Sequence, residues 1–367
     1  MNEYSLFDEF DPVLPSIEWR WRFADYPEKN GLKVFSTFAC AGGSTMGYKL
    51  AGCDVIGCVE IDPKINNIYR ANHHPKYSYC IDLRDFNKIE DLPDELFDLD
   101  ILDGSPPCTT FSMTGDREET WDKMKKFREG QAEQTLDDLS FVFIDTVRKL
   151  RPKVMIMENV EGLLLGEAFS YVQRIYQELG AAGYVVHHWL CKGENMGIPQ
   201  TRHRTFFVAI KASLGIDPSF LDMTFNYEPL PYSAIKMGEG PSINPRTEAY
   251  KLCGLAARPD RDFADVIIRN GLGDTRRRFN VKLCWPERVL PTLPAKLMHL
   301  RPDERQAISV EDIIHASTFP EDFDFGTQSY NQIAYVCGMS VPPVMMKRVV
   351  MKLINQGVFD YKIGEKK

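Results

Sequence analysis

A cysteine in a proline-restricted loop is the residue of this chain best suited to covalent chemistry. Cys108 lies in G-S-P-P-C-T-T-F-S, residues 104–112, directly after an apolar run at 99–102 that has the length of a strand. Two prolines restrict the backbone before it, and an α/β protein binds its ligands at the carboxyl ends of strands. A lone cysteine is usually a small buried hydrophobic residue, but this polar, rigid loop favours an accessible thiolate nucleophile.

An acid and two arginines are predicted to face the same edge of the sheet. Glu158 begins E-N-V after the apolar run at 154–157; the alternative is that Glu158 or Asn159 caps the following helix. Arg202 and Arg204 belong to P-Q-T-R-H-R, residues 199–204, before another strand. Residues two apart on an extended chain point the same way, although exposure to solvent is the commoner fate of arginine.

A glycine-containing loop and two acids indicate a nucleoside-type ligand. F-A-C-A-G-G, residues 38–43, follows a predicted strand and precedes a helix, and glycines there allow a sharp turn and close approach to a ligand. Glu60 ends the next strand, where a carboxylate can hold ribose hydroxyls, and Asp82 follows a further strand candidate. The loop is not G-x-G-x-x-G, so no dinucleotide pyrophosphate site is implied. The alternative is an ordinary glycine turn with capping acids.

Strand-length apolar runs alternate with helical patterns between Lys33 and Lys211. This alternation predicts a mainly parallel sheet covered on both faces. After Lys211 the chain is rich in Pro, Gly and Arg, which indicates a second, smaller domain. The predicted strands are 34–38, 55–59, 99–102, 154–157, 184–190 and 205–210, and the predicted helices are 44–51, 63–71, 136–150, 167–182 and 344–354.

Composition excludes several classes of protein. No run of about 18 apolar residues predicts a membrane span, and the acidic N-terminus lacks a signal pattern. None of the nine cysteines has paired C-x-x-C spacing, so no metal site is predicted and a reducing, cytoplasmic setting is favoured. The net charge is −8, yet residues 241–300 hold 11 Lys+Arg against 6 Asp+Glu, a net of +5, which leaves −13 on the rest. This asymmetry predicts one face that meets phosphates, or chance clustering on a solvated surface.

The order of these motifs resembles that of the cytosine-5 DNA methyltransferases. It continues with R-V-L-P-T-L at 288–293 and G-M-S-V-P-P at 338–343, and the resemblance covers about 33–212 and 286–355. It implies an α/β, S-adenosylmethionine-dependent methyltransferase (Rossmann-like) fold, with a mainly parallel sheet and a smaller target-recognition domain. The implied organisation is an N-terminal extension (1–30), a catalytic and cofactor-binding domain (31–212), a target-recognition domain (213–327) and a C-terminal segment returning to the catalytic domain (328–367).

The resemblance also implies a role for each motif. Cys108 would attack C6 of a flipped cytosine, Glu158 would contact N3 and the exocyclic amine, and Arg202 and Arg204 would bind beside Cys108, Arg204 on O2. A methyl group from S-adenosylmethionine would reach C5 before elimination. The implied cofactor-binding residues are Phe38, Ala39, Cys40, Ala41, Gly42, Gly43, Glu60, Ile61, Asp82, Leu83, Ser105, Pro107, Ser340 and Val341.

Other implied features concern DNA and two departures from the family pattern. DNA contacts are predicted at Arg276, Arg277, Arg278 and Arg288, and residues 113–134 have the length and polarity of a closing loop or of a charged surface helix. Cys40 replaces the first glycine of the family's cofactor loop, and Met339 replaces an asparagine. These departures bear on cofactor affinity more than on reaction type.

The expected partner is double-stranded DNA, and the expected protein is a monomer in the cytoplasm of a bacterial or phage-infected cell, associated with the nucleoid and with restriction-modification. The alternatives are an RNA (tRNA) cytosine-5 methyltransferase and a non-catalytic DNA-binding relative. Retention of Cys108, Glu158 and Arg204 counts against the second. An adenine or N4-cytosine amino-methyltransferase is disfavoured because those enzymes carry an aromatic residue where Cys108 follows the Pro-Pro pair.

Overall fold

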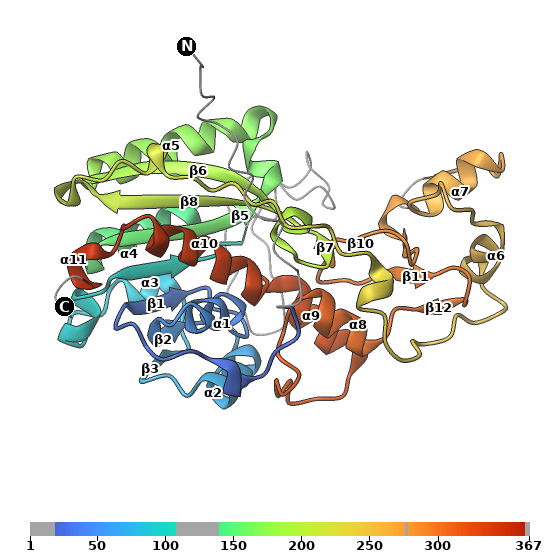
Figure 1. Cartoon of the computed structure of the whole chain (residues 1–367), viewed down its shortest axis with the longest axis horizontal. Helices are drawn as coiled ribbons and strands as arrows, with labels where there is room; N and C mark the ends of the chain where they lie inside the picture. Colours follow the sequence, from blue (N-terminus) through green and yellow to red (C-terminus); the bar gives the residue numbers. More distant parts are fainter. Residues whose placement is uncertain (1–18, 108–138, 276–277, 364–367) are drawn as a thin grey trace, which may run out of the picture.

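Two lobes of unequal size make up the computed structural model, which describes residues 19–107, 139–275 and 278–363. The large lobe is built on a seven-stranded sheet, and the small lobe, at the right of Figure 1, carries α6, α7 and a three-stranded sheet. No helix within the described ranges is long and apolar enough to cross a membrane.

The large sheet has the strand order β3-β2-β1-β4-β5-β8-β6. The first five strands pair in parallel, whereas β8 runs antiparallel to both of its neighbours. The mainly parallel sheet is therefore confirmed, and each of the six predicted strands is present. The strands are β1 (Lys33–Thr37), β2 (Asp54–Val59), β3 (Tyr77–Tyr79), β4 (Ile101–Gly104), β5 (Val154–Val160), β6 (Tyr184–Lys192) and β8 (His203–Lys211).

Helices cover both faces of this sheet, as the alternation predicted. Successive strand residues point to opposite faces, so Val34 belongs to a core cluster with α1 and α10, whereas Phe35 belongs to one with α4 and α5. Figure 1 shows α10, from the end of the chain, lying along the sheet, and α10 packs against α1. The helices of this lobe are α1 (Gly43–Leu50), α2 (Pro63–His73), α3 (Leu83–Phe86), α4 (Leu139–Leu150), α5 (Phe169–Ala181), α10 (Pro343–Asn355) and α11 (Asp360–Ile363).

The small lobe has a hydrophobic core of its own. Phe263, Val266 and Trp285 are buried in it with residues from α6 and the short strands. Those strands are two or three residues long, which is too short for periodicity to reveal them. The elements here are α6 (Glu248–Leu255), α7 (Phe263–Arg269), β9 (Lys282–Leu283), β11 (His299–Arg301) and β12 (Gln306–Ala307).

The segments on either side of the small lobe pack elsewhere. Leu214, Leu221 and Met223 belong to the α1–α10 side of the large core. Two helices after the small lobe join a cluster with Met46 and Ile65 of the large lobe. The remaining α-helices and strands are α8 (Val310–Ala316), α9 (Tyr330–Met339), and the paired strands β7 (Gln200–Thr201) and β10 (Leu290–Pro291).

Candidate active site

A cleft of about 1630 Å³ lies between the two lobes. Its large-lobe wall is formed at the carboxyl ends of β1, β2, β4 and β5, where a parallel sheet binds its ligands. Of the predicted cofactor-binding residues, twelve line this cleft: Phe38, Ala39, Cys40, Gly43, Glu60, Ile61, Asp82, Leu83, Ser105, Pro107, Ser340 and Val341.

The loop at residues 38–43, here called the cofactor loop, is tightly turned. Phe38, Cys40 and Gly42 have φ of 51°, 48° and 94°, a left-handed backbone that favours glycine. A Cβ on Gly42 would lie 2.0 Å from His73 Nε2, and one on Gly43 would lie 2.2 Å from the Val341 carbonyl oxygen.

Two residues of the cofactor loop do not line the cleft. Ala41 is fully buried, its carbonyl oxygen lies 3.0 Å from His73 Nε2, and Gly42 packs against the same ring. Direct cofactor contact by Ala41 and Gly42 stays a prediction, and in the structure both residues pack against His73 on the side of the loop away from the cleft. The amide of Cys40, by contrast, donates a hydrogen bond to the Glu60 carboxylate.

Glu60 connects the cofactor loop to the next turn. Its Oε2 accepts a hydrogen bond from the Cys40 amide, and its Oε1 accepts one from the Asp62 amide, both at 2.8 Å. Burial raises the pKa of the Glu60 carboxyl, which the hydrogen bonds from the amides offset in part. Each carboxylate oxygen has a second lone pair, so Glu60 keeps acceptor capacity toward the cleft.

Two further acids stand at helix starts on the same wall. Asp82 caps α3 by accepting from the Arg84 amide at 2.8 Å, and Asp62 caps α2 through the Lys64 amide at 2.9 Å. Asp62 was not predicted as a site residue, although the Asp-Pro pair that begins α2 is a helix-start signal. Both carboxylates line the cleft.

This wall suits a cationic nucleoside. The side chains of Phe38, Ile61 and Leu83 offer apolar surface, and the carboxylates of Glu60 and Asp82 offer acceptors for hydroxyl and amino groups. Carboxylates also favour a nearby positive charge, such as a sulfonium. The residues present therefore fit S-adenosylmethionine. Within the described ranges, no group of three His, Cys, Asp or Glu side chains could hold a metal ion.

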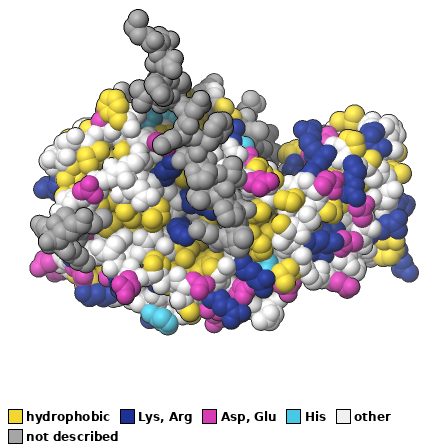
Figure 2. Space-filling view, viewed as in Figure 1, with side chains coloured by type: hydrophobic (Ala, Val, Ile, Leu, Met, Phe, Trp, Pro, Cys, Tyr) yellow, Lys and Arg dark blue, Asp and Glu magenta, His cyan; other side chains and the backbone are white. Residues whose placement is uncertain are grey.

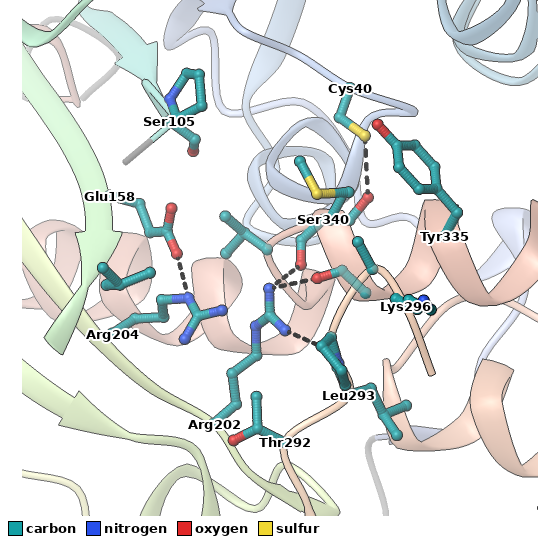
Figure 3. A pocket seen from close by; sticks show the side chains of 18 of the residues that line it. Cys40, Ser105, Glu158, Arg202, Arg204, Thr292, Leu293, Lys296, Tyr335 and Ser340 are labelled. Carbon is teal, nitrogen blue, oxygen red and sulfur yellow. Dashed lines mark hydrogen bonds and ion pairs between the residues drawn. The ribbon is translucent and has the colours of Figure 1, made fainter. Parts of the chain in front are cut away.

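Glu158 and Arg204 form a shielded ion pair at the cleft wall. Arg204 Nε lies 2.7 Å from Glu158 Oε1, and Glu158 is 8 % exposed. The antiparallel pairing of β5 with β8 sets Val160 opposite Arg204, which brings the two side chains to the same end of the sheet. Figure 3 shows the Arg204 guanidinium pointing at the Glu158 carboxylate.

Arg202 turns to a different set of partners. Its NH1 donates to the Leu293 carbonyl at 3.0 Å, and its NH2 donates to the carbonyls of Gly338 and Ser340 at 3.1 and 2.9 Å. The residue is 3 % exposed, and burial lowers the pKa of its guanidinium. Arg202 thereby links Leu293, which follows β10, to the turn between α9 and α10, as Figure 3 shows.

The loop that leads to Cys108 begins inside the cleft. Strand β4 ends at Gly104, and Ser105, Pro106 and Pro107 line the cleft. Asn159 Nδ2 lies 3.5 Å from the Pro106 carbonyl oxygen, so the E-N-V segment contacts this loop. Cys108 itself and residues 113–134 lie outside the described residues.

The small-lobe wall of the cleft is basic. Of the four arginines predicted to contact DNA, Arg278 and Arg288 line this wall, whereas Arg276 and Arg277 lie outside the described residues. Arg278 pairs with Glu248. Two lysines that were not singled out, Lys282 and Lys296, also line it. Figure 2 shows Lys and Arg side chains spread over this lobe, with acidic side chains between them.

The two departures from the family pattern lie together at the opposite rim. The Cys40 sulfur lies 3.7 Å from Ser340 Oγ, and Met339 is exposed in the cleft. Nearby, Thr292 Oγ1 donates to the Thr201 carbonyl, and Gln200 Nε2 donates to the Ala316 carbonyl at 2.7 Å. These bonds join Thr292 and Ala316, from the part of the chain after α7, to β7.

Known proteins share both the sequence pattern and the fold. The family model for C-5 cytosine-specific DNA methylases matches residues 32–252. The Type II methyltransferase M.Sau96I of Staphylococcus aureus is 26% identical over 344 residues, covering 88% of this chain and 75% of that protein. The Type II methyltransferase M1.HphI of Haemophilus parahaemolyticus is 25% identical, covering 88% and 87%.

Solved structures agree at the level of the fold. The structure of a Spodoptera frugiperda DNMT2 mutant has a TM-score of 0.60 and 14% identity, with 88% of this chain and 100% of that chain covered. The fold thus agrees with the sequence relationship. This chain belongs to the C-5 cytosine-specific DNA methylases and is a DNA cytosine-5 methyltransferase whose methyl donor is S-adenosylmethionine.

Proposed function

We propose that methyl transfer takes place in the interlobe cleft, with Cys108 as nucleophile and with Glu158 and Arg204 acting on the target cytosine. One observation carries this assignment: the Glu158–Arg204 pair, the cofactor loop and the loop leading to Cys108 all border one cleft. The carboxyl ends of β1, β4 and β5 and the amino end of the antiparallel strand β8 supply them.

The proposed chemistry begins with addition of the Cys108 thiolate to C6, which breaks the aromaticity of the ring and makes C5 nucleophilic. Glu158 contacts the N3 edge, and Arg204 stabilises the charge that develops at O2. S-adenosylmethionine, when bound, supplies the methyl group. A base or water then takes the C5 proton, the C6–S bond breaks, and Cys108 is restored as thiolate.

Arg202 is assigned a positioning role in place of the substrate contact expected from sequence. Both of its terminal nitrogens donate to backbone carbonyls. By holding Ser340, it supports the rim of the cofactor pocket. Arg204, which is held only by Glu158 and by its own neighbour's carbonyl among the described contacts, stays the candidate for O2.

The cytosine ring must leave the duplex stack to reach this cleft, which costs roughly a few kcal/mol. We propose that Arg278, Lys282, Arg288 and Lys296 offset this cost by contacts with DNA phosphates or base edges. In the proposed organisation, 1–30 is an extension, 31–212 the catalytic domain, 213–327 the target-recognition domain and 328–367 the returning segment. Within 213–327, the separately cored part, with clustered residues between 243 and 300, is the unit proposed to meet DNA.

The relatives named above are Type II methyltransferases. We infer that this chain likewise methylates a fixed DNA sequence within restriction-modification. It would do so as a monomer in the cytoplasm, associated with the nucleoid.

The test is trapping of the covalent intermediate. Cys108→Ala should abolish methylation while cofactor binding and folding persist, and duplex DNA with 5-fluorocytosine should form a stable adduct because fluorine at C5 blocks elimination. Cys80→Ala, at a cysteine that the structure shows as exposed, is the matched control and should form the adduct normally. Methylation by Cys108→Ala near the unmutated rate, or an adduct in that variant, would refute the nucleophile. Transfer to tRNA in preference to duplex DNA would refute the proposed substrate.

A further inference from the structure

Asp103 is a buried carboxylate for which the proposed mechanism has no use. It lies on β4, the central strand between β1 and β5, five residues before Cys108. It is 1 % exposed, and among the described residues no Lys, Arg or His pairs with it. A carboxylate buried without a cation is costly, so its presence in the core calls for a reason.

Hydroxyl groups from the two elements that flank the cofactor loop, β1 and α1, bind this carboxylate. Ser36 Oγ, on β1 two residues before Phe38, donates to Asp103 Oδ2 at 2.7 Å. Tyr48 OH, on α1 just after the loop, donates to Asp103 Oδ1 at 3.1 Å. Tyr48 is fully buried, so water cannot replace this bond easily.

The backbone of Asp103 continues into the loop that carries the nucleophile. Thr37 Oγ1 donates to the Asp103 carbonyl at 3.0 Å, which fastens β4 to β1 a second time. On the opposite face of the strand, a Cβ on Gly104 would lie 2.5 Å from the Phe143 ring, so the strand end cannot shift toward α4. The next residues, Ser105 to Pro107, line the cleft.

We propose that Asp103 is a positioning residue that fixes the cofactor loop relative to residues 105–107, because its two oxygens bind Ser36 and Tyr48 on the two sides of the cofactor loop. The inference rests on the proposed function only for its consequence in catalysis, because the contacts with Ser36 and Tyr48 on either side of the cofactor loop are independent of it.

The charge state of Asp103 controls whether its carboxyl group can accept hydrogen bonds from both Ser36 and Tyr48. An ionised carboxylate only accepts, so both hydroxyls can donate to it, whereas a protonated acid must donate from one oxygen and displace one of them. Burial raises the pKa of Asp103 to about 7; the bonds from Ser36 and Tyr48 lower it and the charge of Glu158 on β5 raises it. Among the described residues, Tyr48 on α1 and Tyr69 on α2 are titratable groups that also face it.

Cofactor affinity and folding stability should consequently respond to pH in opposite directions. Affinity for S-adenosylmethionine should rise as pH increases through about 7, because the ionised Asp103 accepts both hydrogen bonds. The folded-state pKa lies above the unfolded value, so the contribution of Asp103 to stability is present at low pH and is lost as pH rises through about 7. A residue with only a structural role would not make cofactor affinity rise with pH.

The first experiment compares three hydroxyl deletions by calorimetric titration with S-adenosylmethionine. Tyr48→Phe and Ser36→Ala should each raise Kd about tenfold, as expected for a lost hydrogen bond to a charged group. Tyr69→Phe is the matched control: it is equally buried and also bonds α1, through Thr45 Oγ1 at 2.8 Å, but it gives Asp103 no hydrogen bond. Its Kd should stay within about twofold of the unmutated protein.

The second experiment follows Kd and thermal unfolding of Asp103→Asn from about pH 6 to about pH 8. The Asn variant should bind weakly with a flatter pH profile, while its stability no longer falls as pH rises. Titration of the cofactor's own amino group is common to both proteins and cancels in the comparison. Unchanged Kd in both Tyr48→Phe and Ser36→Ala, an equal loss in Tyr69→Phe, or the same pH profile in Asp103→Asn would overturn the proposal. Binding is measured without turnover, so these outcomes stand apart from the Cys108 test.

Discussion

Arg204 Nε lies 2.7 Å from Glu158 Oε1 at the wall of the interlobe cleft. The side chains are 13% and 10% exposed, so solvent screens the pair poorly. The pair therefore fixes the orientation of both groups that are proposed to meet the cytosine ring.

Changing either partner should slow methyl transfer far more than it weakens cofactor binding. Glu158→Gln and Arg204→Lys are each expected to lower kcat by about 10²–10³-fold, because a group aimed at developing charge is lost or misplaced. The fold-loss in kcat of the double variant should be smaller than the product of the two single-variant losses, since the groups act as a unit. Single-turnover kinetics measures this. The surface pair of Arg148 with Glu178 is the control, and Glu178→Gln should leave kcat unchanged. A fold-loss in kcat of the double variant that equals the product of the two single losses would contradict the coupling.

Arg202 and Arg204 should separate into a stability phenotype and a catalytic one. Arg202→Met removes the donors to three backbone carbonyls, and unsatisfied buried polar groups cost about 1–3 kcal/mol each. The free energy of unfolding should fall by about 3 kcal/mol or more, with weaker cofactor binding. Arg204→Met should lose less stability and more kcat. Urea unfolding and single-turnover rates decide this, and an Arg202→Met protein of full stability with only kcat reduced would contradict it.

Gly42 should be intolerant of any side chain. At Gly42→Ala the Cβ would lie 2.0 Å from His73 Nε2, in addition to the strain of a φ of 94°. Gly183→Ala is the control, with a φ of 89° and nothing within 4 Å. The control should lose about 1 kcal/mol of unfolding free energy, and Gly42→Ala about 1–3 kcal/mol more. Only Gly42→Ala should also weaken S-adenosylmethionine binding by calorimetry. Equal losses in the two variants would show that the His73 contact is not limiting.

The basic wall of the small lobe should appear in the salt dependence of DNA binding. Lys296 is exposed in the cleft, and no ion pair involves it among the described residues. Lys296→Gln and Arg288→Gln should each reduce the slope of log K against log salt by about one. Lys251→Gln removes an exposed charge from α6, outside the cleft, and should leave the slope unchanged. Fluorescence anisotropy with duplex DNA measures these slopes, and an equal change in all three variants would refute a localised interface.

The sequence by itself determined the large sheet and most of the cofactor wall. Apolar runs and helix-start signals are local, and the carboxyl ends of parallel strands meet at one edge whatever the rest of the chain does. Glu60, Asp82 and Glu158 could therefore be placed at one edge from their positions after strands. The small lobe was not predictable in the same way, because strands such as β9 and β12 have two residues and show no period.

Tertiary structure alone decided what individual side chains contact. Arg202 and Arg204 have the same type and a spacing that points both to one side, yet one meets a carboxylate and the other meets carbonyls of residues 293, 338 and 340. Those carbonyls converge only when the chain returns after the small lobe. Asp103 comes directly after the predicted strand 99–102, and its hydrogen bonds with Ser36 and Tyr48 exist because β1, α1 and β4 pack together. Periodicity encodes which face is buried, whereas the partner of a buried polar group depends on distant segments that no local pattern specifies.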